Sequence, residues 1–392
     1  MIRTIKDIDV RNKRVLLRCD FNVPLDDKGE VQDDFRIRQT LPTIKYLISQ
    51  KARIVMMSHL GKPKGRVAEE LRLTPVQRKI REISGIPVLK ADDCIGKKVE
   101  KQVSKLKEGE VLLLENLRFH KEEEENDEEF AKELAKLGDV YINDAFGACH
   151  RNHASITKIT KFLPSAAGLL LEKEVKILSR VLENPWRPLV SIIGGAKIES
   201  KTKLIKKLLE KSDHLLIGGK IANAILAVKG LYLSSSWPED KEIVKEIEGL
   251  QLTSTKIHIP IDVLASPDKS GETYVRFSAA GKVRNDELLL DIGPETVDIF
   301  GRIIEEAKMI VWSGPMGLFE NPLFEKGTKG VAEKILRNHK AYKIVGGGDT
   351  NSALLKLGLL DKFDHVSTGG GAMLCLLSGD KLPGLEVLEK TK

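Results

Sequence analysis

The stretch RPLVSIIGGAKIESKTKLIKKLLEKSDHLLIGGK (residues 187–220) decides the fold class of this chain. It contains an apolar run at 187–193, a segment with helical spacing of apolar residues at 201–211, and a second apolar run at 213–217. Each apolar run ends at a pair of glycines. Two apolar runs separated by an amphipathic helix are typical of a β–α–β unit with parallel strands. The stretch therefore predicts a parallel sheet covered by helices.

The same alternation continues along the 392 residues. Further strand-like runs lie at 13–21, 52–58, 110–116, 139–145, 256–264, 288–292, 308–313, 342–346 and 364–368. We therefore expect an α/β protein in which parallel sheets are flanked by helices on both faces. A chain of this length has room for two domains of ordinary size, each with its own core.

The best candidate for a domain boundary is the segment 170–184, where apolar residues recur at helical spacing. Pro185 and Pro188 follow it, and two prolines so close together end a helix. We interpret the segment as a connecting helix. The predicted division is an N-terminal domain at 1–169, the connecting helix at 170–184, a C-terminal domain at 185–378 and a final segment at 379–392.

Composition and charge narrow the class of protein. Apolar residues make up 41% of the chain and charged residues 31%, as in a soluble globular protein. No apolar run approaches the roughly 20 residues of a membrane helix, and the N-terminus lacks a signal-peptide core, so we expect a cytoplasmic protein without a membrane segment. The net charge of +7 is spread along the chain, and aromatic residues amount to only 5%. Nucleic-acid binding, which favours a basic stripe with aromatics, is therefore disfavoured, and small anions are the better partners.

Two local features have a structural interpretation. The dense acidic run KEEEENDEEFAKE (121–133) is typical of a solvated helix face. The cysteines form no CxxC pair, and a reducing compartment explains them as small buried residues: Cys19, Cys94, Cys149 and Cys375. Half of the ligands of a zinc site would be supplied by Cys149, His150 and His153. No second cluster completes the set, so we expect no metal there.

Glycine clusters end five strand-like runs of the C-terminal half. These are SIIGGAK (191–197), LLIGGK (215–220), IVWSGPMG (310–317), KIVGGGDT (343–350) and VSTGGGA (366–372). Strand ends that open into helices are where α/β sheets bind ligands, and glycine lets backbone amides approach a phosphate closely. Neither GxxxxGK[ST] nor GxGxxG occurs, which argues against a P-loop NTPase and a standard dinucleotide turn. The pattern favours a polyphosphate ligand of another type.

Individual side chains at these glycine clusters add to the hypothesis. Lys197 and Lys201 are four residues apart at a predicted helix start, where two positive charges oppose the helix dipole unless an anion is bound. Asp349 can hold a hard cation, Thr350 can cap a helix, and Glu320 can reach a ribose hydroxyl. The alternative is structural. Lys197 and Lys201 would then be solvated surface lysines, and Asp349 and Thr350 would belong to an ordinary helix N-cap.

Basic and hydrogen-bonding side chains, rather than glycines, end the strand-like runs of the N-terminal half. They are Asp20, Asn22, Arg36 (before a helix expected to begin near Pro42), His59, Lys62, Arg118 and Arg151. Guanidinium groups bind carboxylates and phosphates through two parallel hydrogen bonds. Each residue taken alone is also compatible with an ordinary surface or capping role. Together they predict a site for a small polyanion.

The motifs at these strand ends are together similar to those of a known family. The chain resembles phosphoglycerate kinase over its whole length, through RCDFNVP (18–24), RIRQTLPTIKYL (36–47), MSHLGKP (57–63), LLENLRF (113–119), NDAFGACHRNHAS (143–155), GGAKIESK (194–201), WSGPMGLFE (312–320), GGGDT (346–350), STGGGA (367–372) and LPGLEVL (382–388). The resemblance implies two Rossmann-like domains that face a central cleft and are joined by a long helix. It also implies that 379–392 return to the N-terminal domain.

The resemblance implies an activity and its site residues. The reaction is reversible phosphoryl transfer between 1,3-bisphosphoglycerate and ADP, giving 3-phosphoglycerate and ATP in glycolysis. The substrate would be bound in the N-terminal domain by Asp20, Asn22, Arg36, His59, Lys62, Arg118 and Arg151. The nucleotide would be bound in the C-terminal domain by Gly195, Lys201, Gly219, Pro315, Leu318, Glu320, Gly347, Gly348, Asp349 and Thr350. Asp349 would serve Mg²⁺ on the nucleotide phosphates, and the family is expected to be monomeric.

The expected mechanism needs no general base, because the acceptor is a carboxylate. Charge stabilisation on the transferring group would come from Arg36 and Lys197, with the amides of Gly370 and Gly371. Two positions depart from the family pattern: Lys62 replaces an arginine, and Ser313 replaces an asparagine. Two alternatives from other classes are an NAD-dependent dehydrogenase of two α/β domains and a non-enzymatic α/β binding module. The absent GxGxxG argues against the first, and the paired anion sites argue against the second.

Overall fold

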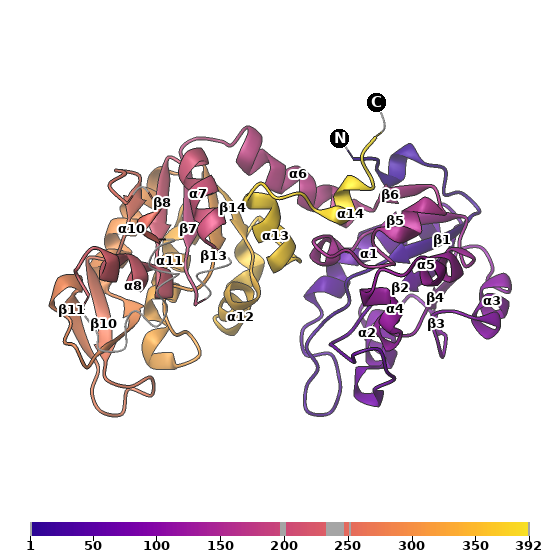
Figure 1. The fold of residues 1–392 in the computed structure, drawn as a ribbon, viewed down its shortest axis with the longest axis horizontal. Coiled ribbons are helices and arrows are strands. Elements are labelled where there is room, and N and C mark those ends of the chain that lie inside the picture. Colours follow the sequence, from indigo (N-terminus) through magenta and orange to yellow (C-terminus); the bar gives the residue numbers. More distant parts are fainter. Residues whose placement is uncertain (1, 197–200, 233–246, 251, 391–392) are drawn as a thin grey trace. The chain divides into compact units, whose positions relative to one another are not determined.

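The computed structural model describes residues 2–196, 201–232, 247–250 and 252–390. The chain divides into two compact units, and Figure 1 labels most of their helices and strands. Unit 1 consists of Met1–Ile177 and Lys381–Lys392, and unit 2 consists of Leu178–Asp380. Helix α6 (Leu169–Glu183) runs from one unit into the other.

Unit 1 is built on a six-stranded parallel sheet with the strand order β3-β4-β2-β1-β5-β6. Its strands are β1 (Arg14–Arg18), β2 (Arg53–Met57), β3 (Val88–Lys90), β4 (Val111–Leu113), β5 (Val140–Asn143) and β6 (Ser165–Ala167). Alternate residues of β1 point to opposite faces, so Val15 and Leu17 join one buried cluster and Leu16 joins another. Both faces are therefore covered, which is why these strands read as continuous apolar runs in the sequence.

The helices of unit 1 lie between the strands along the chain. They are α1 (Phe35–Ser49), α2 (Thr74–Ser84), α3 (Lys97–Ser104), α4 (Lys121–Glu124), α5 (Glu128–Ala135) and α14 (Pro383–Glu386). Short 3-10 helices are η1 (Ile5–Asp7), η2 (Glu69–Leu71), η3 (Leu117–Phe119), η4 (Phe146–Ala148) and η5 (Lys158–Lys161).

The expected helix start near Pro42 is wrong. Helix α1 begins at Phe35 and contains Pro42 in its interior. Its buried residues Ile37, Leu41 and Ile44 form one apolar stripe that passes the proline on both sides. Burial of this stripe outweighs the loss of a single backbone hydrogen bond at Pro42, so the helix continues through it.

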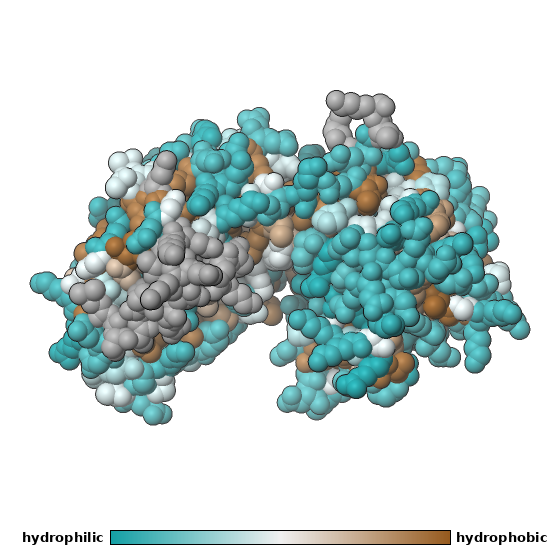
Figure 2. Space-filling model, viewed as in Figure 1, coloured by the Kyte–Doolittle hydropathy of each residue, from teal (hydrophilic) through white to brown (hydrophobic). Residues whose placement is uncertain are grey.

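The acidic run 121–133 forms α4 and α5, and the surface over these helices is hydrophilic, as Figure 2 shows. Phe130 and Ala131 of this run are buried, as apolar residues of a helix usually are, but one charged residue departs from the expectation of a solvated face: Glu123 is fully buried. Its partners, described below, come from other parts of unit 1, which is why the local sequence does not predict its burial.

The C-terminal segment belongs to unit 1 through backbone contacts. Ile2 and Glu389 form an antiparallel bridge, and the amide of Arg3 donates to the carbonyl of Leu388 at 2.8 Å. The amide of Gly384 donates to the carbonyl of Cys149 at 3.0 Å. The two ends of the chain therefore complete one unit together.

Unit 2 contains a six-stranded parallel sheet with the order β15-β14-β13-β7-β8-β9. Its strands are β7 (Leu189–Ile193), β8 (His214–Ile217), β9 (Ile257–His258), β13 (Met309–Ser313), β14 (Tyr342–Val345) and β15 (His365–Val366). Its helices in the described part of the chain are α7 (Thr202–Lys211), α8 (Gly219–Val228), α10 (Pro294–Glu306), α11 (Lys326–Arg337), α12 (Gly348–Lys356) and α13 (Gly370–Leu377), with 3-10 helices η6 (Ala280–Lys282), η7 (Pro322–Phe324) and η8 (Leu360–Lys362).

Unit 2 also holds an antiparallel sheet, β11-β10-β12, which the sequence did not predict. Its strands are β10 (Asp262–Ser266), β11 (Arg276–Ala279) and β12 (Leu288–Ile292). The apolar run 256–264 is split: β9 joins the parallel sheet, and β10 starts the antiparallel one. Pro260 lies between them and cannot donate a ladder hydrogen bond, so it separates the two strands.

In each parallel sheet the strand order reverses beside the first strand of the unit. Strand β1 lies between β2 and β5, and β7 lies between β13 and β8. The loops at the carboxyl ends of these strands meet at the position where open α/β sheets bind ligands. In the described residues, no helix is both long and apolar enough to cross a membrane.

Candidate functional site

Asp20, Asn22 and Arg36 come together in unit 1. Asp20 and Asn22 follow β1, and Arg36 lies in the first turn of α1. Arg36 Nη1 donates to the carbonyl of Asn22 and lies 3.7 Å from Asp20 Oδ1. The Asn22 side chain in turn accepts a hydrogen bond of 2.9 Å from the amide of Gly61, which follows β2. The loops after two neighbouring strands are thus joined through one asparagine.

His59 lies after β2, is buried, and has one defined tautomer. Its Nδ1 is 3.2 Å from Nη2 of Arg18, the last residue of β1. A guanidinium group only donates, so Nδ1 accepts and the ring proton is on Nε2. Burial, followed by the positive charges of Arg18, Arg118 and others, holds the pKa of His59 well below its usual value. His59 is therefore a neutral imidazole that offers an Nε2–H donor.

Arg118 is an arginine with spare hydrogen-bonding capacity. It lies in η3 after β4 and is 2% exposed. Nη1 donates to the carbonyl of Gly61 at 2.7 Å, and Nε lies 3.1 Å from Glu124 Oε1. Nη2 is buried and has no hydrogen-bond partner among the described residues. Buried donors are almost always paired, so this one indicates a missing acceptor.

A buried network lies behind His59 and Arg118. Glu123 accepts from the Ser155 hydroxyl at 2.6 Å and from the Ser155 amide at 2.9 Å. Arg18 donates from Nε to the same hydroxyl at 2.8 Å, and its Nη2 lies 3.8 Å from Glu123. His153 Nδ1 also lies 3.8 Å from Glu123, but burial and the nearby arginines lower the pKa of His153 to about 3. The carboxylate therefore compensates Arg18 rather than a charged histidine.

The two remaining predicted substrate residues are less constrained. Lys62 is exposed in the loop after Gly61, and Arg151 is half-buried after η4. Arg151 is close enough to His59 and His150 for its charge to lower the pKa of both, after burial as the main cause. The predicted residues of the N-terminal half thus gather at the carboxyl ends of β1, β2 and β4, with Arg151 following β5.

Glycines interlock at the strand ends of unit 2. A Cβ atom on Gly314 would lie 2.1 Å from the carbonyl oxygen of Gly194, and one on Gly219 would lie 2.5 Å from the amide nitrogen of Gly195. Gly314 and Gly219 also have positive φ values of 98° and 60°. The loops after β7, β8 and β13 can approach this closely only without side chains.

A cavity of about 280 Å³ lies beside these glycines. Six of the predicted nucleotide residues line it: Gly195, Gly219, Pro315, Leu318, Glu320 and Asp349. One wall is apolar and comes from the antiparallel sheet, through Val263 of β10 and Leu289, Leu290 and Ile292 of β12. The shape and lining are typical of a small-molecule site, apolar with a few polar groups.

Four other predicted nucleotide residues lie outside the lining. Lys201 is buried, and its Nζ donates to the carbonyl of Gly194, so it is not a solvated surface lysine. The Thr350 hydroxyl accepts from the amide of Gly314 at 2.7 Å and thus joins the loops after β13 and β14. Gly347 and Gly348 begin α12, and Gly348 is exposed with no atom within 4 Å of a Cβ position. Backbone at Gly348 is open to a ligand.

The predicted catalytic residues fall in different places. Gly370 and Gly371 form the first turn of α13, and a Cβ on Gly370 would lie 3.0 Å from Gly347 Cα. The first turns of α12 and α13 are therefore adjacent. Lys197 lies outside the described residues. Arg36 belongs to the cluster of unit 1 already described.

Sequence reasoning missed part of the cavity. Met316 and Phe319 lie within WSGPMGLFE, where the sequence pattern by itself indicated only the glycines and Glu320, and Lys220 follows the glycine pair 218–219. Asn223, which lies in α8, gave no signal. The wall residues gave none either, because they belong to strands that pair antiparallel. Ser313, which departs from the family pattern, is buried at the end of β13.

Comparison with known proteins identifies relatives along the whole chain. A family model described as phosphoglycerate kinase matches residues 5–380. The protein named phosphoglycerate kinase from Dictyoglomus turgidum is 46% identical over 391 residues, covering 99% of this chain and 98% of that protein. Its namesake from Moorella thermoacetica is 47% identical over 388 residues, covering 98% of each chain.

Solved structures are similar over the same length. Phosphoglycerate kinase from Coxiella burnetii has a TM-score of 0.85 and 36% identity, covering 99% of both chains. The enzyme from Pyrococcus horikoshii OT3 has a TM-score of 0.86 and 32% identity, covering 99% of this chain and 98% of that one. The similarity in fold and sequence therefore extends over both units.

Proposed function

The chain belongs to the phosphoglycerate kinase family, and we propose from this premise how its residues divide the reaction between the two units. The enzyme transfers a phosphoryl group reversibly between 1,3-bisphosphoglycerate and ADP, giving 3-phosphoglycerate and ATP in glycolysis. It is a phosphotransferase with a carboxyl group as acceptor. This activity excludes the two alternatives raised by the sequence, an NAD-dependent dehydrogenase and a non-enzymatic binding module.

The phosphoglycerate site is proposed at the strand ends of unit 1. The observation that carries it is the buried Nη2 of Arg118, which lacks an acceptor among the described residues. A phosphate or carboxylate oxygen supplies that acceptor, in a charge-assisted bond. Asp20, Asn22 and Arg36 would bind the hydroxyl and carboxyl end, and His59, Lys62 and Arg151 complete the set.

His59 has a distinct role in this proposal. Several arginines already supply positive charge, and a charged imidazole beside them would be repelled. As a neutral ring with its proton on Nε2, His59 adds a hydrogen-bond donor to an anion without adding charge.

The nucleotide site is proposed at the cavity of unit 2. A purine base fits against the apolar wall and the Pro315 turn, and Glu320 would accept from the ribose. The phosphates would follow the glycine loops toward Lys201 and the amides at the start of α12. In this arrangement Thr350 acts mainly through the loops that it joins.

One predicted residue, Asp349, has the type of side chain that would bind the metal of the nucleotide. Asp349 lines the cavity in the first turn of α12, and its carboxylate oxygens are hard ligands of the kind that Mg²⁺ prefers. Bound Mg²⁺ would neutralise charge on the nucleotide phosphates.

Catalysis then depends on positioning and charge. The acceptor carboxylate is ionised at neutral pH and needs no base. Arg36 from unit 1, Lys197 from unit 2 and the amides of Gly370 and Gly371 would stabilise the charge of the transferring phosphoryl group. Because Lys62 presents one charge rather than a fork, it would hold substrate less tightly than arginine. Ser313 would likewise weaken nucleotide binding relative to asparagine.

Both substrates must meet, so we propose that the units close on each other when both are bound, with α6 as part of the hinge. Closure also excludes water from the transfer. Small-angle scattering tests this: the radius of gyration should fall only when both substrates are added, and an unchanged value in the ternary complex would refute closure. We propose further that the enzyme is a cytoplasmic monomer, which sedimentation equilibrium and cell fractionation can check.

A coupled assay with 3-phosphoglycerate and Mg-ATP tests the division of the site. Arg118→Met should raise the KM for 3-phosphoglycerate about 10- to 100-fold, because a charge-assisted bond is lost, while the KM for ATP stays constant. Arg78→Met is the control, since Arg78 forms an exposed ion pair with Glu30. An equal rise in both KM values for Arg118→Met, in protein of native circular dichroism, would contradict the assignment.

A further inference from the structure

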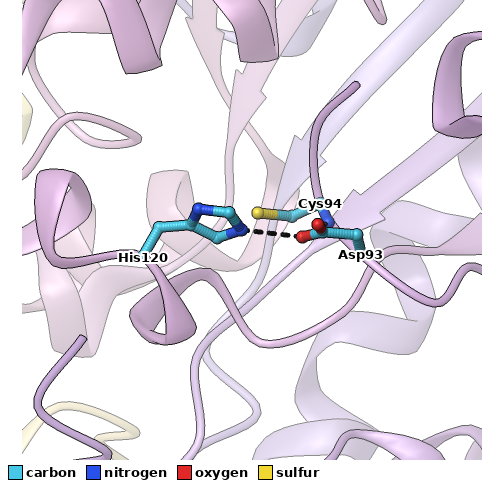
Figure 3. Close-up of side chains that lie close together, drawn as sticks. All are labelled: Asp93, Cys94 and His120. Carbon is cyan, nitrogen blue, oxygen red and sulfur yellow. Dashed lines mark hydrogen bonds and ion pairs between the residues drawn. The ribbon is translucent and has the colours of Figure 1, made fainter. Parts of the chain in front are cut away.

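Three metal-binding side chains of different types converge in unit 1 outside the proposed substrate site (Figure 3). Asp93 and Cys94 follow β3, and His120 lies between η3 and α4. Their ligand atoms all lie within 4.8 Å of one another, the only such group of three among the described residues. The phosphotransfer reaction gives these residues no task.

Backbone structure holds the three residues in place. Strands β3 and β4 are parallel neighbours, and just after β3 the amide of Ala91 donates to the carbonyl of Leu113, the last residue of β4, at 2.9 Å. The amide of Glu115 then donates to the carbonyl of Asp93 at 3.2 Å. The His120 ring packs on Phe130 with centroids 5.4 Å apart. The arrangement is therefore preformed, which reduces the entropy cost of binding a ligand.

Donor groups converge on the carboxylate of Asp93. His120 Nε2 lies 2.7 Å from Asp93 Oδ1, and the amide of Cys94 donates to the same oxygen at 2.7 Å. The Asp93 carboxylate is thus held by the two segments that carry the other two side chains.

We propose that Asp93, Cys94 and His120 bind a divalent, thiophilic cation, best represented by Zn²⁺, which replaces the thiol proton. A thiolate and a carboxylate balance the two positive charges, and the imidazole is a neutral ligand. Zinc binds sulfur at ~2.3 Å and nitrogen or oxygen at ~2.0–2.2 Å, so small side-chain rotations bring all three atoms onto one ion.

The surroundings leave room for water as the fourth ligand. Cys94 is fully buried, whereas the side chains of His120 and Asp93 are 26% and 53% exposed. The ion would therefore enter from the solvent side. Sulfur and nitrogen ligands favour Zn²⁺ over Mg²⁺, so this site is chemically distinct from the proposed nucleotide metal site. Binding ties the loop after β3 to the start of α4.

Titration of the full-length, metal-free enzyme without nucleotide tests the proposal. Calorimetry with Zn²⁺ should give one equivalent bound with release of a proton, seen as a heat that depends on the buffer. Co²⁺ should give thiolate charge-transfer absorption. Excess Mg²⁺ should leave both signals unchanged. At free Zn²⁺ about 100 times the Kd, the unfolding midpoint should rise by about 5–10 °C.

Matched variants decide whether these residues are the ligands. Cys94→Ser and His120→Gln should each weaken binding at least ~10-fold and abolish or shift the cobalt absorption. Cys375→Ser and His339→Gln are the controls, and they should bind as the wild type does. If Cys94→Ser does not fold, His120→Gln alone decides the result, because His120 is partly exposed. Absence of stoichiometric binding, or full binding by His120→Gln, overturns the proposal.

Discussion

Glu123→Gln tests the buried network behind the proposed phosphoglycerate site. The substitution keeps the shape of the side chain but removes the charge that compensates Arg18, and both side chains are at most 1% exposed. The two carboxylate oxygens of Glu123 accept hydrogen bonds from Ser155, and the substitution replaces one of these oxygens by an amide group that donates. Leaving a buried charge without its partner costs about 3–5 kcal/mol. In a unit of this size that corresponds to about 6–20 °C in the unfolding midpoint.

Calorimetry and far-UV circular dichroism measure the loss. All three tryptophans fall within the range of unit 2, so their fluorescence is an internal reference for the unit that does not contain Glu123. The matched control is Glu125→Gln, whose side chain is 58% exposed and lies 3.8 Å from Lys121 in an i,i+4 pair. The control should change stability by less than about 0.5 kcal/mol.

The same variant should affect catalysis selectively. Arg18 fixes the tautomer of His59, so loss of its partner should raise the KM for 3-phosphoglycerate ~5-fold, equivalent to about one hydrogen bond, with the KM for ATP unchanged. The nitrogen chemical shifts of His59 report the tautomer directly. If Glu123→Gln matches Glu125→Gln in both stability and His59 tautomer, the reasoning about this network is wrong.

Three further predictions concern other places in the chain. Burial raises the pKa of Asp144 to about 7, so between about pH 4 and pH 7 the folded protein binds a proton that the unfolded chain has lost. The wild type therefore loses stability as the pH rises through this window. Asp144→Asn lacks this proton, so its free energy of unfolding should gain about 1.4 kcal/mol relative to wild type per pH unit, as measured by urea unfolding. Gly314→Ala should unfold at much lower temperature because its Cβ would collide with the carbonyl of Gly194, whereas Gly348→Ala should fold normally and raise the KM for ATP; equal melting points would contradict this. Lys197→Ala should lower turnover at least about a hundredfold with little change in nucleotide affinity, and unchanged turnover in stopped-flow assays would remove its catalytic role.

Much of the fold was predictable because parallel strands buried on both faces leave a strong pattern in the sequence. Runs such as 187–193 and 52–58 correspond to β7 and β2, and the glycine or polar residues that follow them lie at the strand ends as expected. Strand β11 was missed because only one of its four residues is buried, so RFSA has no apolar run. The helix start at Phe35 was missed because a proline is a strong local signal that burial of the whole helix overrides.

The residues of the candidate site likewise fall into those that the neighbouring sequence predicts and those that depend on distant segments of the chain. Asp20, Asn22, His59 and Arg118 were predictable because each follows an apolar run. Arg18 and Glu123 were not, because the side chains that each of them contacts belong to residues at least 30 positions away in the chain. The cluster of Asp93, Cys94 and His120 was invisible for a similar reason, since 25 residues of sequence separate its members.

The sequence by itself therefore determined the α/β class, the positions of most strands and the family, because apolar periodicity and strand-end motifs are local properties. Only the tertiary structure decided which polar side chains are buried, which tautomer His59 adopts and which glycines must lack a side chain. These properties depend on atoms brought together from distant segments. A glutamate in an acidic surface run and a glutamate that compensates a buried arginine look alike until the chain has folded.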